Sequence, residues 1–246
     1  MSRFLNAVRF LTIFPIQRWA APTSEQMGTS MLFFPFVGTI LGLILVLVAR
    51  VLAGVFPPGV LGAILVGLLI VMTGGLHWDG VADTFDGLAG AQGDKSRMLA
   101  IMKDARIGAI GVLSLVFLVT FKIVLLAELP LDWWKPALIL MPMIGRFLQV
   151  ELAAWGHYAR PEEGTGKAFV EGVTARDFWI ALAGVALISV LVSGWMGLGI
   201  LILCLLYGFG VKAFFHRKIG GITGDILGMV SETGEVLVLV LFYLFQ

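Results

Sequence analysis

The sequence carries very little charge. Only 13% of its 246 residues are Asp, Glu, Lys or Arg, whereas soluble domains carry about 25%. Apolar residues make up 59%, and the mean hydropathy is +0.98. Its single cysteine, Cys204, lies in an apolar run and excludes an intramolecular disulfide. There is no basic patch with interleaved aromatic side chains, and a net charge of +1 gives no indication of nucleic acid binding. The shortage of charge indicates an integral membrane protein.

Long apolar runs account for this composition. Seven ranges are each about 16–22 residues long, near the length that crosses a bilayer as a helix. They are 31–49, 60–76, 107–127, 136–155, 178–193, 196–214 and 226–245. The ranges on either side of Gly194 can also be read as one bent hairpin. Residues 1–20 mix arginines with apolar side chains, unlike a cleaved signal, and predict an interfacial amphipathic helix. We expect an all-α polytopic membrane fold that forms one catalytic domain, 1–246.

Basic residues are divided unevenly between the two ends of the predicted spans. Only Arg50 and Lys135 fall at one end, and Lys122 and Arg146 fall inside spans. The other 13 of the 17 gather at the opposite end: Arg3, Arg9, Arg18, Lys95, Arg97, Lys103, Arg106, Arg160, Lys167, Arg176, Lys212, Arg217 and Lys218. Cytoplasmic loops of membrane proteins carry the excess of Lys and Arg. We therefore expect the N-terminus and the polar loops 77–106, 156–177 and 212–225 to face the cytoplasm.

The most informative polar segment is GLHWDGVADTFDG, at 75–87. Asp79, Asp83 and Asp86 are spaced i, i+4 and i+7, so a helix would carry them within a ~60° arc of one face. Three like charges on one stripe repel, and Mg²⁺ combines a few carboxylates with substrate phosphate oxygens. The spacing predicts a magnesium site for a phosphorylated substrate. His77 points away from Asp79 and is either a hydrogen-bonded histidine or a ligand.

A second polar segment lies at 102–111, at the start of the third span. Lys103 and Arg106 are suited to binding phosphate, or are positive-inside anchors. Asp104 is either a further metal ligand or a partner of Arg106. Gly108 and Gly111 make a small-residue face for close helix packing.

A third segment, at 220–235, begins with a glycine-rich turn and enters the last span. Gly221, Thr223 and Gly224 lie where free backbone N–H groups can meet an anion. Asp225 and Glu232 share a face but lie about 10 Å apart along a helix, too far for one metal ion. A carboxylate inside a membrane helix marks a functional site by default, and a structural network is the alternative.

Charged residues also fall inside the third and fourth spans. Arg146 follows Gly145, and Glu151 lies five residues later. Arg146 cannot shed its charge, so it needs either an acidic partner or a substrate phosphate. Both alternatives stay open here. Lys122 in the third span is more ambiguous, since a lysine can also snorkel to the interface.

These motifs together resemble the cobalamin synthase family, which transfers ribazole to adenosylcobinamide-GDP. The resemblance extends over FLTIFP at 10–15, 76–87, 102–111, Gly145-Arg146 and 220–235. Many relatives carry an arginine where this chain has Ile13. The aspartate motif and GGITGD at 220–225 are specific in combination.

The resemblance implies a Mg²⁺-dependent enzyme that joins adenosylcobinamide-GDP to α-ribazole or its 5′-phosphate, with GMP as the leaving group. Asp79, Asp83 and Asp86 would then hold Mg²⁺ on the diphosphate, and Lys103, Arg106 and Arg146 would brace phosphate oxygens. Asp225 or Glu232 would accept the proton of the attacking hydroxyl.

Two other functions compete with this one. A CDP-alcohol phosphotransferase also uses clustered aspartates, but the Ala-Arg and the later aspartate pair of its signature are missing here. A cation-coupled transporter would carry acids at the middle of the bilayer on broken helices. Small residues such as Gly38 and Gly42 permit contacts within the chain or between copies, so a homo-oligomer is a further expectation.

Overall fold

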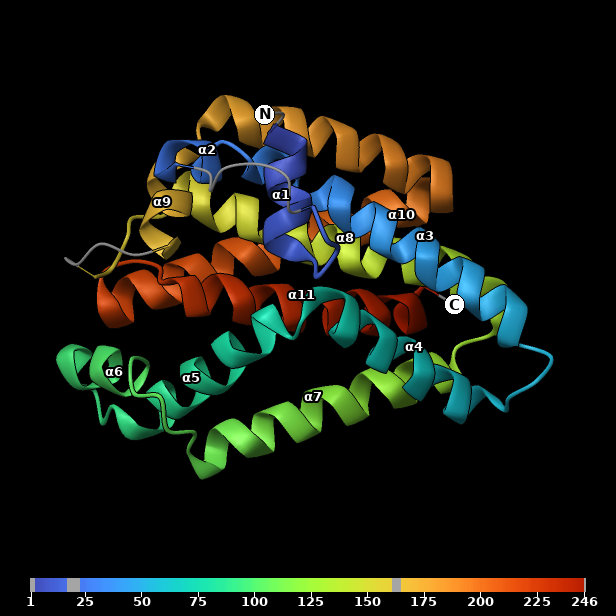
Figure 1. Ribbon diagram of the computed structural model, residues 1–246, viewed down its shortest axis with the longest axis horizontal. Helices are drawn as coiled ribbons and strands as arrows, with labels where there is room; N and C mark the ends of the chain where they lie inside the picture. Colours follow the sequence, from blue (N-terminus) through green and yellow to red (C-terminus); the bar gives the residue numbers. More distant parts are fainter. Residues whose placement is uncertain (1–2, 17–22, 161–164, 246) are drawn as a thin grey trace.

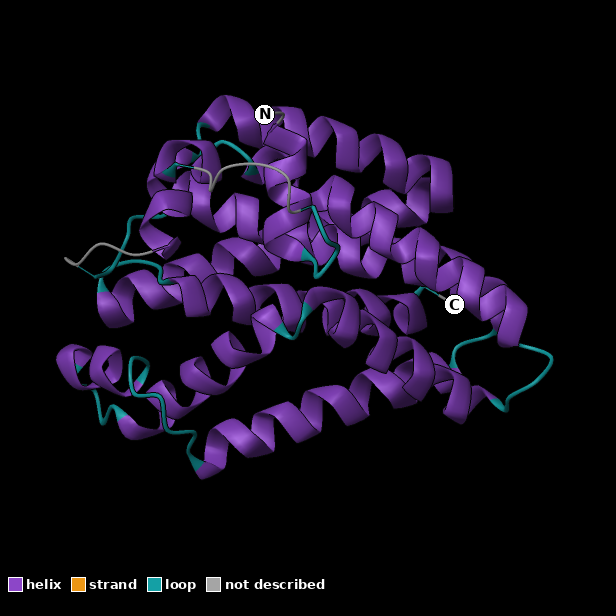
Figure 2. Cartoon of the chain, viewed as in Figure 1, coloured by secondary structure: helices purple, strands orange, loops and turns teal. Residues whose placement is uncertain are grey.

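The computed structural model describes residues 3–16, 23–160 and 165–245, and in these ranges the chain is helical, with one isolated β-bridge and no strand (Figures 1 and 2). The elements are α1 (Arg3–Leu11), α2 (Ser24–Gly28), the 3-10 turn η1 (Met31–Phe33), α3 (Phe34–Leu52), α4 (Pro58–Thr73), α5 (Leu76–Gly90), α6 (Lys95–Ile101), α7 (Ala109–Glu128), α8 (Leu131–Trp155), α9 (Thr165–Gly172), α10 (Ala175–Ile219) and α11 (Gly224–Leu244). The all-α polytopic fold predicted from composition is confirmed.

The predicted spans correspond to long apolar helices of the structure. In the described ranges five helices are long and apolar enough to cross a membrane, and a sixth is counted if α4 and α5 form one broken span. Each of the seven predicted ranges is mostly helical. Two of them, 178–193 and 196–214, lie in the single element α10, which is interrupted only at Ser193 and Gly194. The chain reverses its direction at these two residues. Gly197, after the break, consequently lies against the carbonyl oxygen of Ser189, before it.

The predicted interfacial segment 1–20 is only partly described. Its helix, α1, is amphipathic and buries Asn6, Ala7 and Leu11. Residues 1–2 and 17–20 lie outside the described residues.

The centre of the molecule is α8, which packs against α3, α10 and α11 (Figure 1). Every residue of α8 from Ala137 to Ala153 is buried. Gly38 and Gly42 of α3 lie directly against the backbone of α8, where no Cβ fits. This small-residue face therefore serves packing within the chain, and a homo-oligomer stays a prediction.

A sharp bend places α5 across α11. Gly74 and Gly75 have φ values of 61° and 68°, a region that glycine adopts without steric cost. The axes of α4 and α5 consequently meet at 96°. Gly80 of α5 lies so close to α11 that a Cβ there would be 2.5 Å from the carbonyl oxygen of Asp225. The bend and this crossing bring the two acidic motifs of the sequence together.

Candidate active site

Asp79 and Asp83 occupy one face of α5, as their spacing predicts. Asp79 is exposed and Asp83 is half-buried. Neither carboxylate has a hydrogen bond or an ion pair within the described ranges. Two unneutralised acids one helical turn apart are an electrostatically unfavourable arrangement that a bound cation would relieve.

The start of α11 carries the third carboxylate of this site. Thr223 caps the helix, and its Oγ1 accepts the N–H of Ile226 at 3.4 Å. Asp225 receives two hydrogen bonds, from Arg160 Nη2 at 2.7 Å and from Thr223 Oγ1 at 3.2 Å. Both contacts use Oδ2, so Oδ1 of Asp225 has no hydrogen-bond partner among the described residues.

The turn before α11 is held by a short pairing with the chain that follows α8. The N–H of Ile222 donates to His157 O at 2.7 Å, and the N–H of Ala159 donates to Ile222 O at 2.9 Å. This pairing puts Arg160 next to Asp225. Arg160 also donates to the carbonyl oxygen of Met102 at 3.4 Å, which connects the loop before α7 with the site.

A cavity of about 230 Å³ opens between α5 and α11. Its polar lining includes Asp79, Asp225, His77 and Gln149. Three aromatic rings face it from other parts of the chain: Phe10, Phe34 and Phe169. Phe169 packs on both other rings, with centroid distances of 4.5 and 5.5 Å. A cavity with acids on one wall and aromatic rings on another suits a ligand with a charged part and a planar or apolar part.

The electrostatic environment of Asp83 differs from that of an ordinary surface acid. Burial, with the nearby charges of Asp79 and Asp225, raises the pKa of Asp83 to about 7, and Arg160 opposes the shift. Asp83 lies on α5, which is not among the five helices that are long and apolar enough to cross a membrane by themselves. A carboxyl pKa raised by burial and by neighbouring acids is typical of a functional site.

Asp86 does not share this environment, although it lies on the same stripe. Its carboxylate accepts the N–H groups of Gly108 at 2.6 Å and Gly111 at 2.8 Å, in the first turn of α7. A Cβ at either glycine would collide with this carboxylate. A Cβ at Gly111 would also lie 3.1 Å from the carbonyl oxygen of Ala82, so the predicted close packing of the glycine face is present. Asp86 thus fastens α7 to α5.

The predicted phosphate-binding residues before α7 lie outside the cavity. Arg106 is exposed, and its guanidinium donates to both oxygens of Asp104, the shortest bond being 2.6 Å. These hydrogen bonds lower the pKa of Asp104 to about 2. Of the two predicted roles for Asp104, the structure therefore shows the partner of Arg106. Lys103 is also exposed and does not line the cavity.

The glycine-rich turn is divided between two environments. Gly224 lines the cavity, whereas Thr223 is fully buried and caps α11. Gly221 faces away from the cavity and packs against the carbonyl oxygen of His157.

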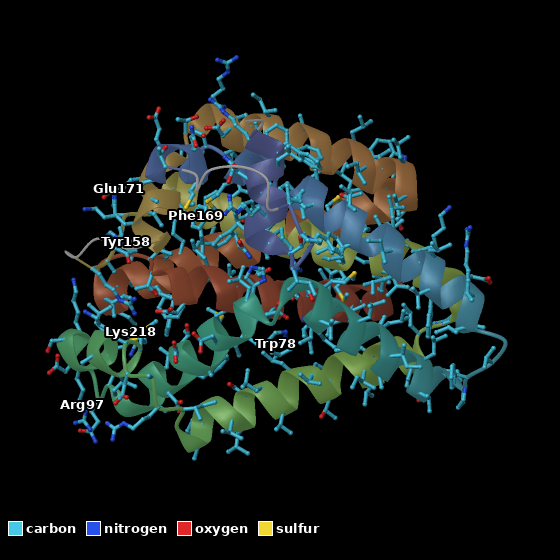
Figure 3. All side chains as sticks on the ribbon, in the orientation of Figure 1. Trp78, Arg97, Tyr158, Phe169, Glu171 and Lys218 are labelled. Carbon is cyan, nitrogen blue, oxygen red and sulfur yellow. The ribbon has the colours of Figure 1, made fainter. Side chains whose placement is uncertain are left out.

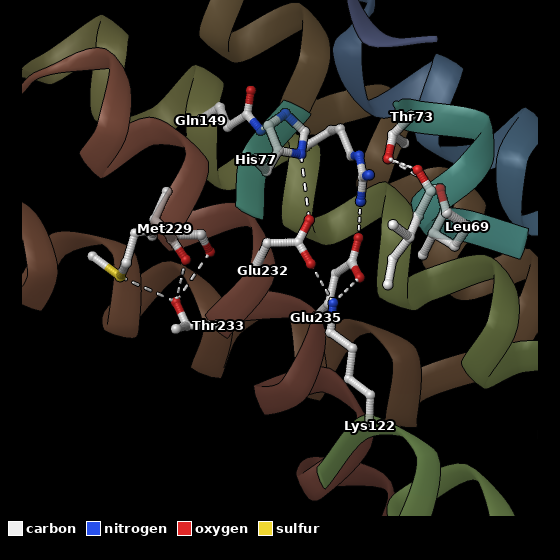
Figure 4. A network of polar contacts seen from close by, with 12 residues as sticks. Leu69, Thr73, His77, Lys122, Gln149, Met229, Glu232, Thr233 and Glu235 are labelled. Carbon is white, nitrogen blue, oxygen red and sulfur yellow. Dashed lines mark hydrogen bonds and ion pairs between the residues drawn. The ribbon is translucent and has the colours of Figure 1, made fainter. Parts of the chain in front are cut away.

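Behind the cavity a chain of buried charges links four helices (Figure 4). Lys122 of α7 contacts Glu232 and Glu235 of α11, both at 2.5 Å. Arg146 of α8 forms an ion pair with Glu235. Glu232 extends the chain to His77 of α5, whose Nδ1 lies 3.4 Å from its Oε1.

This network decides several alternatives that the sequence left open. Arg146 is fully buried and has an acidic partner, Glu235 rather than Glu151. Glu232 does not line the cavity but touches His77, which does. His77 also shares a 2.9 Å hydrogen bond with Gln149, so it is a hydrogen-bonded histidine. The structural network is therefore present at Glu232 and Glu235.

The fit of the acids to a divalent ion is more limited than the stripe suggested. Across the described ranges no group of three or more His, Cys, Asp or Glu side chains has the geometry of a metal site. Asp86 and Asp104 are engaged elsewhere, which leaves Asp79 and Asp83, with Asp225 on the facing helix. Because Mg²⁺ is commonly held by one or two carboxylates plus substrate phosphates, this smaller set suits an ion that arrives with its substrate.

Sequence reasoning missed Arg160, Gln149 and Phe169 as site residues. Arg160 was only one of 13 basic residues on its side of the membrane, and nothing local distinguishes it. Gln149 offered a better signal, since an amide inside an apolar span needs a partner.

Comparison with known proteins gives a consistent result. The family model described as cobalamin-5-phosphate synthase matches residues 3–243. The adenosylcobinamide-GDP ribazoletransferase of Geotalea daltonii is 42% identical over 236 residues, or 96% of this chain and 94% of that protein. The protein of the same name from Acetivibrio thermocellus is 38% identical over 248 residues, covering 100% and 99% of the two chains. No solved structure matches this one.

Proposed function

Because the chain belongs to the cobalamin-5-phosphate synthase family and is a transferase of cobalamin synthesis, we propose that it joins adenosylcobinamide-GDP to α-ribazole or its 5′-phosphate. The products would be adenosylcobalamin or its phosphate, and GMP. In this reaction a ribazole hydroxyl forms an O–P bond to the phosphorus on the cobinamide side, and the P–O bond to GMP breaks.

The observation that carries this proposal is the meeting of three acids across the α5–α11 crossing, of which only Asp225 has a basic partner. Asp79 and Asp225 line one cavity, and Asp83 lies close enough to both for their charges to raise its pKa. A diphosphate with its counter-ion is the group that such a wall would bind. The three phenylalanines opposite suit the planar base of ribazole or guanine.

Asp79 and Asp83 would hold Mg²⁺ against the substrate. When bound, the ion would neutralise charge on the diphosphate and on departing GMP. Asp225 is held by Arg160, whose remaining donors suit a phosphate oxygen.

The attacking hydroxyl must lose its proton to a group in the cavity wall. Of the two acids that the sequence suggested, only Asp225 lines the cavity. Arg160 and Thr223 fix its Oδ2, which leaves Oδ1 to accept the proton. Glu232 instead positions His77. Arg146 is neutralised by Glu235 and is therefore not assigned to phosphate binding. Lys103 and Arg106, outside the cavity, remain candidates for phosphate binding.

The site would face the cytoplasm of a bacterial cell. Arg50 and Lys135, the two basic residues predicted at the other membrane face, line one cavity at the end of α3 and the start of α8. This grouping is what the positive-inside distribution requires.

The direct test is GMP release by the protein purified in detergent. We expect release only when adenosylcobinamide-GDP, α-ribazole and Mg²⁺ are all present, and its loss on chelation with EDTA. Release without α-ribazole would indicate a hydrolase. Full activity after chelation would exclude the magnesium role.

A further inference from the structure

A second cavity, distinct from the candidate active site, lies at the end of the long helix α10. Its volume is about 360 Å³. The side chains that give it character are Lys212, His216 and Arg217 of α10, with Trp155 and His157 from the end of α8 and the loop after it. We refer to this cavity as the basic cleft.

The basic cleft gathers positive charge, and none of the described residues that line it is Asp or Glu. Within the part of the chain that the structure describes, Lys212, His216 and Arg217 form no ion pair. Glu151 is buried against Gly208 and does not line the cleft; its charge attracts Lys212, but the two side chains form no direct ion pair. The rings of His157 and His216 face each other with centroids 6.2 Å apart. Such a cleft suits an anion.

Its position relates that anion to the membrane. The basic cleft lies at the end of a span whose preceding residues expose apolar side chains, including Leu206 at 63% and Phe209 at 42%. Leu206, Phe209, Lys212 and His216 are three or four residues apart, so they follow one face of the helix. Lys212 Nζ lies 5.3 Å from the ring centroid of Phe209. An apolar face that continues into a cationic cleft matches a molecule with an acyl chain and an anionic head.

Further basic side chains lie near this end of the molecule (Figure 3). Lys218, which follows the cleft residues on α10, lies at the same end as Arg97, together with Tyr158 and the acidic Glu171. Trp155 adds an aromatic side chain that is 37% exposed at the edge of the cleft. Aromatic and basic side chains together at a helix end are typical of the interface between lipid head groups and acyl chains.

We propose that the basic cleft binds the phosphodiester head group of an anionic phospholipid, with the acyl chains along Leu206 and Phe209. The phosphate would contact Lys212 and Arg217, and Trp155 would flank the glycerol region. This assignment does not depend on the reaction proposed above, because it rests on charge and placement outside the catalytic cavity.

The test compares lipid retention by full-length protein using native mass spectrometry. The protein in detergent is titrated with phosphatidylglycerol or phosphatidylcholine. The variants are Lys212→Gln/Arg217→Gln and a control, Arg50→Gln/Lys135→Gln, which removes the same charges from the cavity at the opposite end. We expect the cleft variant to retain on the order of tenfold less phosphatidylglycerol, and the control and wild type to retain equal amounts.

Equal losses in both variants would overturn the proposal, as would equal retention of the two lipids by the wild type. Displacement of phosphatidylglycerol by millimolar inorganic phosphate would show that the site recognises free phosphate instead. A second measurement uses phosphatidylglycerol brominated near the head group. It should quench the tryptophan fluorescence of the wild type more than that of Trp155→Phe. Unchanged quenching in Trp155→Phe would place the lipid elsewhere.

Discussion

Three aspartates of one motif lie in three different surroundings, and the differences determine what each can do. Asp79 lines the cavity, and Asp83 is half-buried between acids on two helices. Both carboxylate oxygens of Asp86 accept hydrogen bonds from backbone N–H groups at the start of α7. Sequence spacing predicts a shared face for the three but not which of them has partners, because the partners of Asp86 lie more than 20 residues further along the chain.

Replacement of Asp86 should therefore act mainly on stability. Asp86→Ala leaves two N–H groups at the start of α7 without their acceptor, which costs about 1–3 kcal/mol. We expect a lower midpoint of thermal unfolding in detergent. Asp104→Asn, which removes charge from an exposed ion pair, should change the midpoint very little. Equal midpoints for Asp86→Ala and the wild type would contradict the fastening role.

The raised pKa of Asp83 predicts that magnesium binding depends on pH. Metal ligands must be deprotonated, and Asp83 holds a proton below about pH 7 in the free protein. The Mg²⁺ concentration for half-maximal GMP release should thus rise by up to about tenfold per pH unit below 7, and level off above it. A requirement that is the same at pH 6 and pH 8 would show that Asp83 is not a ligand.

At the scale of elements, the site depends on how closely α5 crosses α11. Gly80 allows this approach on the side of α5. On the side of α11, a Cβ added to Gly228 would lie 3.0 Å from the carbonyl oxygen of His77. The crossing aligns Asp79 and Asp83 with Asp225. Glycine spacing is visible in the sequence, but its partner helix is not, since a small residue fits many interfaces.

A methyl group at this crossing should disturb catalysis. Gly80→Ala must push α11 away, because its Cβ would be 2.5 Å from a backbone oxygen. Overpacking costs about 1–3 kcal/mol, and a displacement near 1 Å can lower the rate by about 100-fold. The control is Gly67→Ala in α4, where a Cβ meets nothing within 4 Å. Normal GMP release by Gly80→Ala would argue against the crossing as the basis of the site.

Helix existence was predictable from apolar length, whereas helix partnerships were not. The bend at Gly74 and Gly75 and the reversal at Gly194 fall where glycines interrupt apolar runs. The pairing of Arg146 with Glu235 joins helices that are far apart in sequence. A hydropathy pattern describes each helix separately. It therefore could neither pair these charges nor identify Arg160 as the partner of Asp225.

At the scale of the whole molecule, the uneven distribution of basic residues predicts one orientation in the membrane. The single cysteine, Cys204, is fully buried, which makes the chain suitable for labelling at introduced cysteines. Asp132 and Asp94 lie at the two ends of the predicted topology.

In spheroplasts, a membrane-impermeant maleimide should label Asp132→Cys directly. Asp94→Cys should react only after the membrane is permeabilised, because the positive-inside distribution predicts a cytoplasmic location for it. The wild type reports background from Cys204. The reverse pattern of labelling would invert the proposed orientation and move the site to the outer face.

The central claim is that Asp83, between Asp79 and Asp225, belongs to the transfer site. It is tested most directly by the rate of GMP release from adenosylcobinamide-GDP and α-ribazole by purified Asp83→Asn. The matched variant is Asp132→Asn, an exposed acid at the opposite end of the molecule. We expect at least about a 100-fold loss for Asp83→Asn with an unchanged elution volume and thermal midpoint, because a ligand of the charge-neutralising ion is lost. Asp132→Asn should keep the wild-type rate. Near-normal release by folded Asp83→Asn would show that Asp83 does not belong to the transfer site.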